Sequence, residues 1–369
     1  MAEATEVASG LLAWFVLHAR DLPWRHSRDA YGIWVSEVML QQTQVQTVIP
    51  YWHRWMRQLP TIGDLANAPE EQLLKLWEGL GYYSRARNLQ KAARVVTDTH
   101  GGNVPSTIAD LLGLPGVGPY TAGAIASLAY NQPEPLVDGN VARVLTRLRM
   151  IEGDPREPET KATLWSIATQ LIKATGKLHS VPSTPLARGR FSILNQALME
   201  LGATVCTSRA PSCDQCPIRK SCQAFASGAV ERFPALAPRV KATRLRYAVV
   251  VLQRSGKWFL RQRGAGDVNH GLWEFPQLEL RLRPANPVRQ VAEWLDITPK
   301  SLHPLPRVRH AITRYQITLE VFQASVDKTP VALGDGQWLT TREIEALALT
   351  SAHRKIALNA IEPVNIQTD

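Results

Sequence analysis

Apolar residues recur every three or four positions through residues 1–226, the spacing of one face of an α-helix. Between Pro69, which suits the first turn of a helix, and Gly101-Gly102, which end one, these positions hold Leu73, Leu74, Leu76, Trp77, Leu89, Ala92, Ala93 and Val96. Further helices are expected over 106–113, with Ser106 as the cap, over 119–130, and after Asp138. Residues 1–226 are therefore predicted to form an all-α domain.

The pattern changes after Cys222. Residues 227–243 contain glycine, prolines and mixed charge, which predicts a linker. Apolar runs over 247–252 and 258–260 flank a Ser-Gly turn and predict a β-hairpin. Another strand is expected over 315–322, a capping box at Thr340 and Glu343, and a last helix over 351–361. We expect an α+β domain over 244–364, so the fold class is multidomain, all-α followed by α+β.

Composition and charge limit the classes of function. The chain has 369 residues, and no stretch approaches the roughly 20 apolar residues that span a bilayer, so we expect no membrane contact. The apolar run at 11–17 follows Glu3 and Glu6, where a secretory signal would be positive, which favours an intracellular protein. Lys and Arg number 42 against 32 Asp and Glu, a net charge of +10 that favours a polyanionic partner such as nucleic acid.

All four cysteines lie within seventeen residues, as Cys206, Cys213, Cys216 and Cys222. Thiols at this density bind a metal or become oxidised. Structural zinc sites usually pair two Cys-x-x-Cys arms or add histidine, whereas this segment has a single such arm with two outlying cysteines. The spacing favours a [4Fe-4S] cluster, with zinc as the alternative.

A second motif, Leu-Pro-Gly-Val-Gly-Pro-Tyr at 114–120, lies between two predicted helices. Its glycines allow a tight turn that presents backbone N–H groups ahead of a helix N-terminus. This pattern predicts a helix-hairpin-helix whose turn, Gly116, Val117 and Gly118, binds a DNA phosphate without reading sequence. An ordinary turn between helices is the alternative, and the cysteine loop and the basic charge favour DNA.

Two carboxylates have the placement that acid catalysis needs. Asp138 directly precedes a predicted helix, where it can cap the helix and stay ionised, as stabilising a cationic transition state requires. Glu37 shares a helix face with Ile33 and Trp34, so burial is expected to raise its pKa toward that of a general acid. A Glu at the edge of that face, reaching for water, is the alternative.

Taken together, the motifs resemble the MutY family of adenine DNA glycosylases, in the endonuclease III superfamily. The resemblance covers nearly the whole chain and rests on Trp24-Arg25, Ser36 to Gln44, Gly79 to Asn88, Val137 to Val141 and the four-cysteine loop. It implies a base-excision repair enzyme that removes adenine mispaired with 8-oxoguanine or guanine from duplex DNA. The adenine must leave the base stack to be reached.

The family resemblance also implies a role for each site residue. Glu37 protonates the adenine, and Asp138 stabilises an oxocarbenium-like sugar, while Asn140 and Tyr120 orient the carboxylates and water. Trp24, Arg25 and Gln196 line the adenine pocket. The remaining DNA contacts are expected from Leu40, Gln42, Thr43, Tyr82, Arg87 and the hairpin, with Gln42, Thr43 and Tyr82 probing the stack. Plain core packing is the alternative for Trp24 and Tyr82.

Tyr120 separates two kinds of glycosylase. Relatives that also cut the strand carry a lysine in this hairpin, whose amine attacks C1′ to form a Schiff base. A phenol cannot form an imine. The resemblance therefore implies a monofunctional enzyme that leaves an abasic site.

The C-terminal part resembles the Nudix-like lesion-recognition domain of the family, including Gly-Leu-Trp-Glu-Phe-Pro at 271–276. The stretch 288–294, where a working Nudix hydrolase has a Glu-rich helix, has one acid, so we expect no nucleotide hydrolysis. The family usually has Phe-Ser-His in a lesion-reading loop, where this chain has Val308, Arg309 and His310. Either Arg309 replaces the serine with a charged contact or discrimination for 8-oxoguanine is weaker, and His310 favours retained recognition.

Two other functions are consistent with parts of the pattern. One is a glycosylase of the same fold for another mispaired or oxidised base, against which Glu37 and the second domain argue. The other is a non-catalytic damage-binding protein, against which retention of both Glu37 and Asp138 argues. We expect a monomer that is intracellular and DNA-associated, in the cytoplasm or nucleoid if bacterial.

Overall fold

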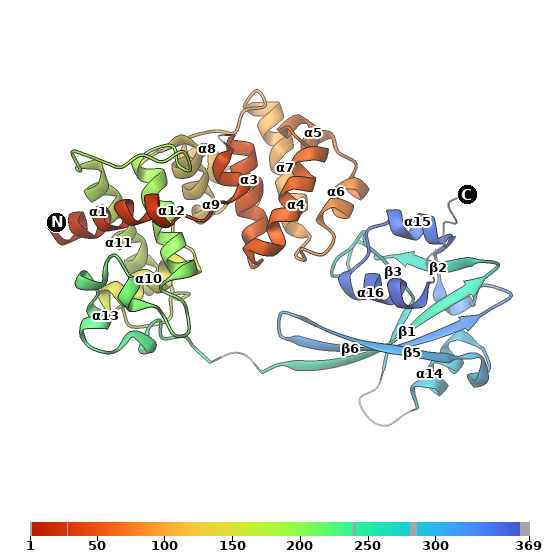
Figure 1. Cartoon of the computed structure of the whole chain (residues 1–369). Coiled ribbons are helices and arrows are strands. Elements are labelled where there is room, and N and C mark those ends of the chain that lie inside the picture. Colours follow the sequence, from red (N-terminus) through yellow and green to blue (C-terminus); the bar gives the residue numbers. More distant parts are fainter. Residues whose placement is uncertain (1, 28, 239–240, 281–285, 362–369) are drawn as a thin grey trace, which may run out of the picture. The chain divides into compact units, whose positions relative to one another are not determined.

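The computed structural model describes residues 2–27, 29–238, 241–280 and 286–361 (Figure 1). The chain forms two compact units, one of Met1–Ala68 and Arg87–Pro238 and the other of Pro69–Ala86 and Arg239–Asp369. The linker proposed over 227–243 includes 239–240, and the second domain proposed over 244–364 includes 281–285 and 362–364. These three segments lie outside the described residues.

Helices make up the first unit. They are α1 (Ala2–His18), α2 (Pro23–His26), α3 (Ala30–Leu40), α4 (Val45–Gln58), α5 (Ile62–Asn67), most of α7 (Ser84–Thr99), α8 (Ile108–Leu112), α9 (Pro119–Ala124), α10 (Gly139–Arg149), α11 (Pro158–Gly176), α12 (Arg190–Thr204) and α13 (Gln223–Ala226). Short 3-10 turns cover Cys213–Gln215, Arg219–Ser221 and Val230–Arg232.

The second unit combines α6 (Glu70–Trp77) with strands and further helices. The strands are β1 (Thr243–Arg254), β2 (Lys257–Gln262), β3 (Trp273–Glu274), β4 (Gln277–Glu279), β5 (His303–Ile312), β6 (Tyr315–Ser325) and β7 (Gln337–Leu339). The helices are α14 (Pro287–Leu295), α15 (Thr341–Ala346) and α16 (Ser351–Ala360), and 3-10 turns cover Pro299–Ser301 and Val331–Leu333.

Side-chain caps set the start of the helices that carry the site. The Asp29 carboxylate accepts hydrogen bonds from the Tyr31 and Gly32 N–H groups at the start of α3, at 3.2 and 3.1 Å. Asp138 does the same for α10 through the Val141 N–H, at 2.7 Å. Side-chain acceptors at this position satisfy N–H groups that have no partner within the helix.

Two predictions for the helical part differ from the structure. The cap of α8 is Thr107 rather than Ser106, because the Thr107 hydroxyl accepts from the Asp110 N–H at 3.2 Å. The helix expected over 119–130 is α-helical only to Ala124 and continues as one wide π-turn over Ile125–Ala129. Such turns are seldom visible in apolar spacing, because they insert one residue into an otherwise helical pattern.

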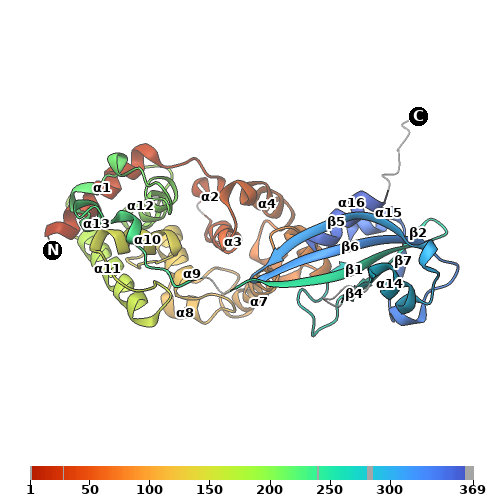
Figure 2. The same cartoon turned by 90° about the horizontal axis from the view of Figure 1, so that it is seen from below.

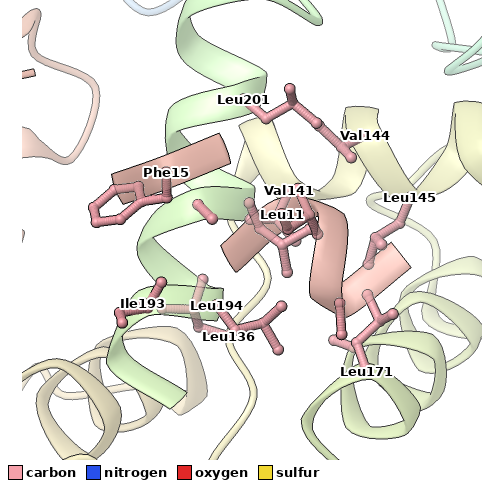
Figure 3. Packing of buried hydrophobic residues seen from close by; sticks show 14 of the residues in the cluster. Leu11, Phe15, Leu136, Val141, Val144, Leu145, Leu171, Ile193, Leu194 and Leu201 are labelled. Carbon is pink, nitrogen blue, oxygen red and sulfur yellow. The ribbon is translucent and has the colours of Figure 1, made fainter. Parts of the chain in front are cut away.

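A core of the first unit joins helices from both ends of the sequence. Leu11 and Phe15 of α1 pack with Val141 and Val144 of α10, Leu171 of α11, and Ile193, Leu194 and Leu201 of α12 (Figure 3). These side chains are at most 2% exposed, and burying each one contributes roughly 1.5–3 kcal/mol. The core therefore fixes α12 against α10, two helices whose residues reach the site described below.

The sheet of the second unit is mixed. Its strands run in the order β3-β2-β1-β6-β5, with β4 paired to β1 and β7 to β2. The pair β1 and β6 is parallel, in register from Thr243 opposite Tyr315 to Gln253 opposite Ser325, and the other pairs are antiparallel. The predicted hairpin at 247–260 is confirmed by the pairing of Gln253 with Trp258.

Alternate residues of β1 point to opposite faces of this sheet, so both faces carry a core. Val249 and Val251 pack with Ile344 of α15 and Ile356 of α16, whereas Val250 packs with Leu295 of α14. Figure 2 shows α15 and α16 on one face of the sheet and α14 on the other. The predicted capping box of Thr340 and Glu343 is confirmed at the start of α15. The second unit is therefore a sheet between helices.

Val308, Arg309 and His310 lie inside β5, not in the loop that the sequence predicts. Arg309 pairs with Thr318 and His310 with Ile317 of β6, and the turn of this hairpin falls between Ile312 and Tyr315. The sequence did not predict this strand, because its first residues include prolines and its later ones include charged side chains. The pairing of β5 with β6 also shifts register between Leu305 and Val308.

None of the helices in the described ranges has the length and apolar character that crossing a bilayer requires.

Candidate active site

One cavity in the helical unit gathers most of the predicted site. Its volume is about 560 Å³, within the range of roughly 300–1,000 Å³ typical of small-molecule sites. The predicted residues that line it are Trp24, Arg25, Glu37, Leu40, Gln42, Thr43, Tyr120, Asp138, Asn140 and Gln196. They come from α2, α3 and the turn after it, α9, the start of α10, and α12.

Glu37 reaches this cavity from a buried position on α3. Only 4% of the residue is exposed, and one carboxylate oxygen, Oε2, accepts a hydrogen bond from the Tyr120 hydroxyl at 2.5 Å. Burial raises the pKa of Glu37 to about 7, since the hydrogen bond from Tyr120 and the charge of Arg25 only partly oppose burial, and the charge of Asp138 adds to it. The predicted burial is confirmed, and this pKa suits a general acid near neutral pH.

Asp138 occupies both carboxylate oxygens with donors from its own helix. Oδ1 accepts from the Val141 N–H at 2.7 Å, and Oδ2 accepts from the Asn140 amide at 3.0 Å. Burial nevertheless raises the pKa of Asp138 above its ordinary value, although these hydrogen bonds and the Arg143 charge lower it. Capping by Asp138 is confirmed, and the effect of burial on its pKa outweighs that of the hydrogen bonds at the helix terminus.

Tyr120 keeps its proton and acts as a donor. Burial and the nearby Glu37 and Asp138 charges raise the pKa of the phenol well above its ordinary value. Its hydroxyl donates to Glu37 and also lies 3.6 Å from the Met199 sulfur. The cavity lining as described includes arginines but no lysine.

Trp24 and Gln196 are held firmly in the cavity wall. Trp24 is 6% exposed and meets Trp52 edge to face, with ring centroids 6.3 Å apart. The Gln196 amide donates to the Leu186 carbonyl and the Ser192 hydroxyl, both at 3.2 Å. Gln42, by contrast, is exposed in the turn after α3 with a φ of 57°.

Several lining residues were missed by the sequence analysis, among them Arg20, Arg188, Met199 and Glu200. Glu200 follows Gln196 by one turn of α12 and is surrounded in sequence by Leu198, Met199 and Leu201. A lone acid within an apolar run is the same signal that singled out Glu37. The position of Glu200 in an apolar run could therefore have indicated its burial, although Glu200 belongs to none of the motifs.

Other predicted residues lie outside the cavity. Arg87 is half-buried on α7, and Tyr82, Arg309 and His310 belong to the second unit. The hairpin turn at 116–118 also lies elsewhere, with two exposed glycines on either side of a buried Val117.

A glycine is required in the hairpin turn. Gly116 has a φ of +77°, and a Cβ added there would lie 2.6 Å from the Asn88 Cβ. The Val117 N–H donates to the Leu114 carbonyl at 3.1 Å, so it closes the turn itself. Only the exposed backbone at Gly116 and Gly118 is then left to meet a phosphate in the way that the motif predicts.

Asn140 links the Asp138 carboxylate to the cysteine segment. Its side-chain Nδ2 donates to Asp138, and its side-chain Oδ1 accepts from Arg143 Nη2 at 2.8 Å. Arg143 Nε donates to the Cys206 carbonyl at 2.8 Å, and Arg147 Nη1 lies 3.3 Å from the Cys206 sulfur. Helix α10 therefore carries Asp138 at its start and contacts the cysteine segment through two arginines.

All four cysteines are free thiols that line one small cavity beside α10 and α12. Among the described residues, no three His, Cys, Asp or Glu side chains are grouped to hold a metal ion. Cys206, Cys216 and Cys222 pack against the core that joins α1, α10, α11 and α12, and the Arg147 guanidinium beside Cys206 supplies positive charge. A [4Fe-4S] cluster takes four cysteine thiolates, and the four thiols that line this cavity supply donors of that kind and number.

Two family models match separate parts of the chain. Residues 35–170 match the HhH-GPD superfamily of base excision DNA repair proteins, and residues 247–359 match the NUDIX domain. The first match contains Glu37, Tyr120 and Asp138, and the second contains most of the sheet of the second unit.

Similar proteins extend these matches over nearly the whole chain. The adenine DNA glycosylase of Homo sapiens is 38% identical over 96% of this chain and 74% of its own length, and that of Schizosaccharomyces pombe is 30% identical over 98% and 90%. The solved structure of a thermostable thymine-DNA glycosylase is 28% identical, with a TM-score of 0.52 over 61% of this chain and 98% of that chain. The chain is a DNA-binding hydrolase, and it belongs to the adenine DNA glycosylase family of base excision DNA repair enzymes.

Proposed function

We propose that this enzyme removes adenine mispaired with 8-oxoguanine or guanine, and that the cavity of Glu37 and Asp138 receives the everted adenine nucleoside. The observation that carries the proposal is the convergence of a protonatable Glu37 and a capped Asp138 on one cavity. A base inside a duplex cannot reach a cavity of this kind, so it must first leave the stack, which costs least at a mispair.

Glu37 is proposed to be the general acid. Near neutral pH a large fraction of this group carries a proton, which it can deliver to N7 of adenine as the bond between C1′ and N9 breaks. The base then leaves as a neutral molecule. The Tyr120 hydroxyl holds the carboxylate in place and stabilises the negative charge that remains on it after proton transfer.

Asp138 is proposed to stabilise the positive charge that develops on the sugar. Its oxygens are fixed by Val141 and Asn140, so no reorganisation is needed when the charge appears. Water then adds to C1′ and gives a proton to the ionised Glu37 carboxylate, which yields the abasic site and restores the acid, following the two-carboxylate logic of glycoside hydrolysis. A single positioned acid supplies only about 10²–10⁴-fold acceleration, so the electrostatic contribution of Asp138 must provide much of the remainder.

The enzyme is proposed to be monofunctional. Strand cleavage through a Schiff base needs an amine next to C1′, and the hairpin offers the Tyr120 phenol in that position. We further propose that Leu40, Gln42 and Thr43 at the cavity, Tyr82, Arg87, and the exposed backbone of Gly116 and Gly118 contact the duplex. Trp24, Arg25 and Gln196 would form the wall against the adenine ring.

We propose that Cys206, Cys213, Cys216 and Cys222 hold a [4Fe-4S] cluster. The cluster would cross-link a loop that otherwise has only short 3-10 turns, so its contribution there is structural. Arg209, Arg219 and Lys220 lie in the same segment and supply positive charge for DNA phosphates.

Replacing Cys213 by Ser is expected to lower the affinity for DNA more than the rate of the bound complex, because Asp138 and Glu37 are held by other contacts. Iron content, absorbance and duplex affinity measured on the purified full chain check this, with Ser221→Ala as a matched control in the same segment. Normal affinity in an iron-free variant would contradict the proposed role of the cluster in DNA binding.

We propose a catalytic domain over 1–226, a linker over 227–243 and a lesion-recognition domain over 244–364, with Arg309 and His310 among its contacts to the duplex. Arg309 is exposed on β5, and His310 is half-buried beside it. The protein is proposed to act as a monomer at intracellular DNA.

The proposed substrate is tested with duplexes carrying A:8-oxoG, A:G, T:G and an oxidised pyrimidine. We expect alkali-labile sites at adenine in the first two duplexes and no strand breaks without alkali. Excision of thymine or of the oxidised pyrimidine in preference to adenine would contradict the substrate. Breaks that form without alkali would contradict the monofunctional mechanism.

A further inference from the structure

A buried carboxylate on α12 joins two arginines at the wall of the same cavity. Glu200 Oε1 accepts from Arg20 Nε at 2.7 Å and from the Arg20 backbone N–H at 3.0 Å. Glu200 Oε2 accepts from Arg20 Nη2 at 2.9 Å and from Arg25 Nη2 at 2.8 Å. All three residues line the cavity that contains Glu37.

Glu200, Arg20 and Arg25 form a charge cluster in which two of the three side chains are buried, so opposite charges must compensate each other. The Glu200 side chain is 1% exposed and that of Arg25 is 7% exposed, whereas that of Arg20 is 37% exposed. Burial raises the pKa of Glu200, but the hydrogen bonds and charges of Arg20 and Arg25 outweigh it and bring the pKa to about 2. Glu200 is therefore ionised at neutral pH and compensates the largely buried cation of Arg25.

The positive charge of Arg25 acts on Glu37, the proposed general acid. The titratable and charged groups that act on Glu37 are Tyr120 of α9, Asp138 at the start of α10, and Arg25 of α2. The charge of Arg25 favours the ionised form of Glu37, which cannot donate a proton. A second bond from Arg25 Nη1 to the Arg20 carbonyl, at 2.8 Å, helps to fix the guanidinium in its place.

We infer that Glu200 is a positioning residue that keeps the Arg20 and Arg25 guanidinium groups paired on one wall of the cavity, so that their positive charge acts less on Glu37. This inference rests on the proposed function, in which Glu37 donates the proton. A purely structural role, in which the three residues only anchor α2 against α12, predicts the same fractional loss of activity at every pH.

The test is the pH dependence of single-turnover excision from an A:8-oxoG duplex by the full chain. Glu200→Gln removes one negative charge, so Arg25 is less compensated and the pKa of Glu37 falls. The decline of activity with rising pH then begins at a lower pH than in the wild type. A shift of one pH unit corresponds to about a tenfold loss on the alkaline side and little loss on the acidic side.

Arg20→Gln provides a second variant with the opposite expectation. Its side chain is partly exposed, so the change is milder, and Glu200 is left to compensate Arg25 alone. The decline is therefore expected at a higher pH than in the wild type. If Glu200→Gln does not fold, this variant decides, and an unchanged or lower pH of decline would overturn the inference.

Glu274→Gln is the matched control. Glu274 in the second unit is also 1% exposed and also lies between two arginines, Arg261 and Arg263. It is expected to leave the pH of decline where the wild type has it. An unmoved decline in Glu200→Gln, with normal wild-type excision, overturns this inference alone. Absence of adenine excision by the wild type overturns the proposed function and the inference with it.

Discussion

Asp138→Asn is expected to lower the first-order rate of adenine excision by about 10³-fold and to leave the affinity for the mispaired duplex nearly unchanged. The substitution removes the negative charge that faces the developing oxocarbenium ion. Asparagine caps a helix as well as aspartate does, so the start of α10 should persist. The effect then reports the charge and not the fold.

Single-turnover excision and equilibrium binding, measured with the same A:8-oxoG duplex, separate the two contributions. Asp29→Asn is the matched control, because Asp29 caps α3 in the same way and is absent from the described lining of the cavity. We expect that control to excise at the wild-type rate. An excision rate for Asp138→Asn within tenfold of the wild-type rate would contradict the electrostatic role assigned to Asp138.

Glu37→Gln is expected to lower the excision rate by about 10²–10⁴-fold, the range supplied by one positioned acid. Glutamine retains the shape of the side chain and an acceptor for the Tyr120 hydroxyl, but its amide is too weak an acid to protonate adenine. The pKa of Glu37 is about 7 and its protonated form is the active one, so wild-type activity should fall as the pH rises through that value. The variant should lack this decline.

The full pH profile of both proteins under single-turnover conditions checks this prediction. Glu293→Gln, on the exposed side of α14, serves as a control for loss of a carboxylate elsewhere. The same alkaline decline in Glu37→Gln would show that another group titrates, and Glu37 would then not be the acid.

The sequence predicted the parts of the site that local patterns determine. Glu37 shares a helix face with Ile33 and Trp34, so its burial followed from spacing alone. Asp138 precedes a helix, so its role as a cap followed as well. That both carboxylates share one cavity is a tertiary fact, and only the family resemblance suggested it, since α3 and α10 are separated by about a hundred residues.

The remaining features depend on contacts that spacing does not encode. Glu200 and Arg20 are 180 positions apart, and their pairing arises from the way α12 packs against the segment after α1. The choice of Thr107 over Ser106 as a cap depends on one residue of register, which sequence patterns rarely fix. Residues 308–310 form a strand because they pair with β6, and the charged residues among them do not indicate that pairing.

The pH experiments and the two substitutions measure consequences of one arrangement, in which an acid and a charge stabiliser act on the same nucleoside. A crystal structure of the Asp138→Asn protein with an A:8-oxoG duplex examines that arrangement itself. We predict an everted adenine in this cavity, with N7 roughly 3 Å from the Glu37 carboxyl and C1′ facing residue 138. An adenine that stays stacked in the duplex, or that occupies a different pocket away from Glu37, would contradict the account.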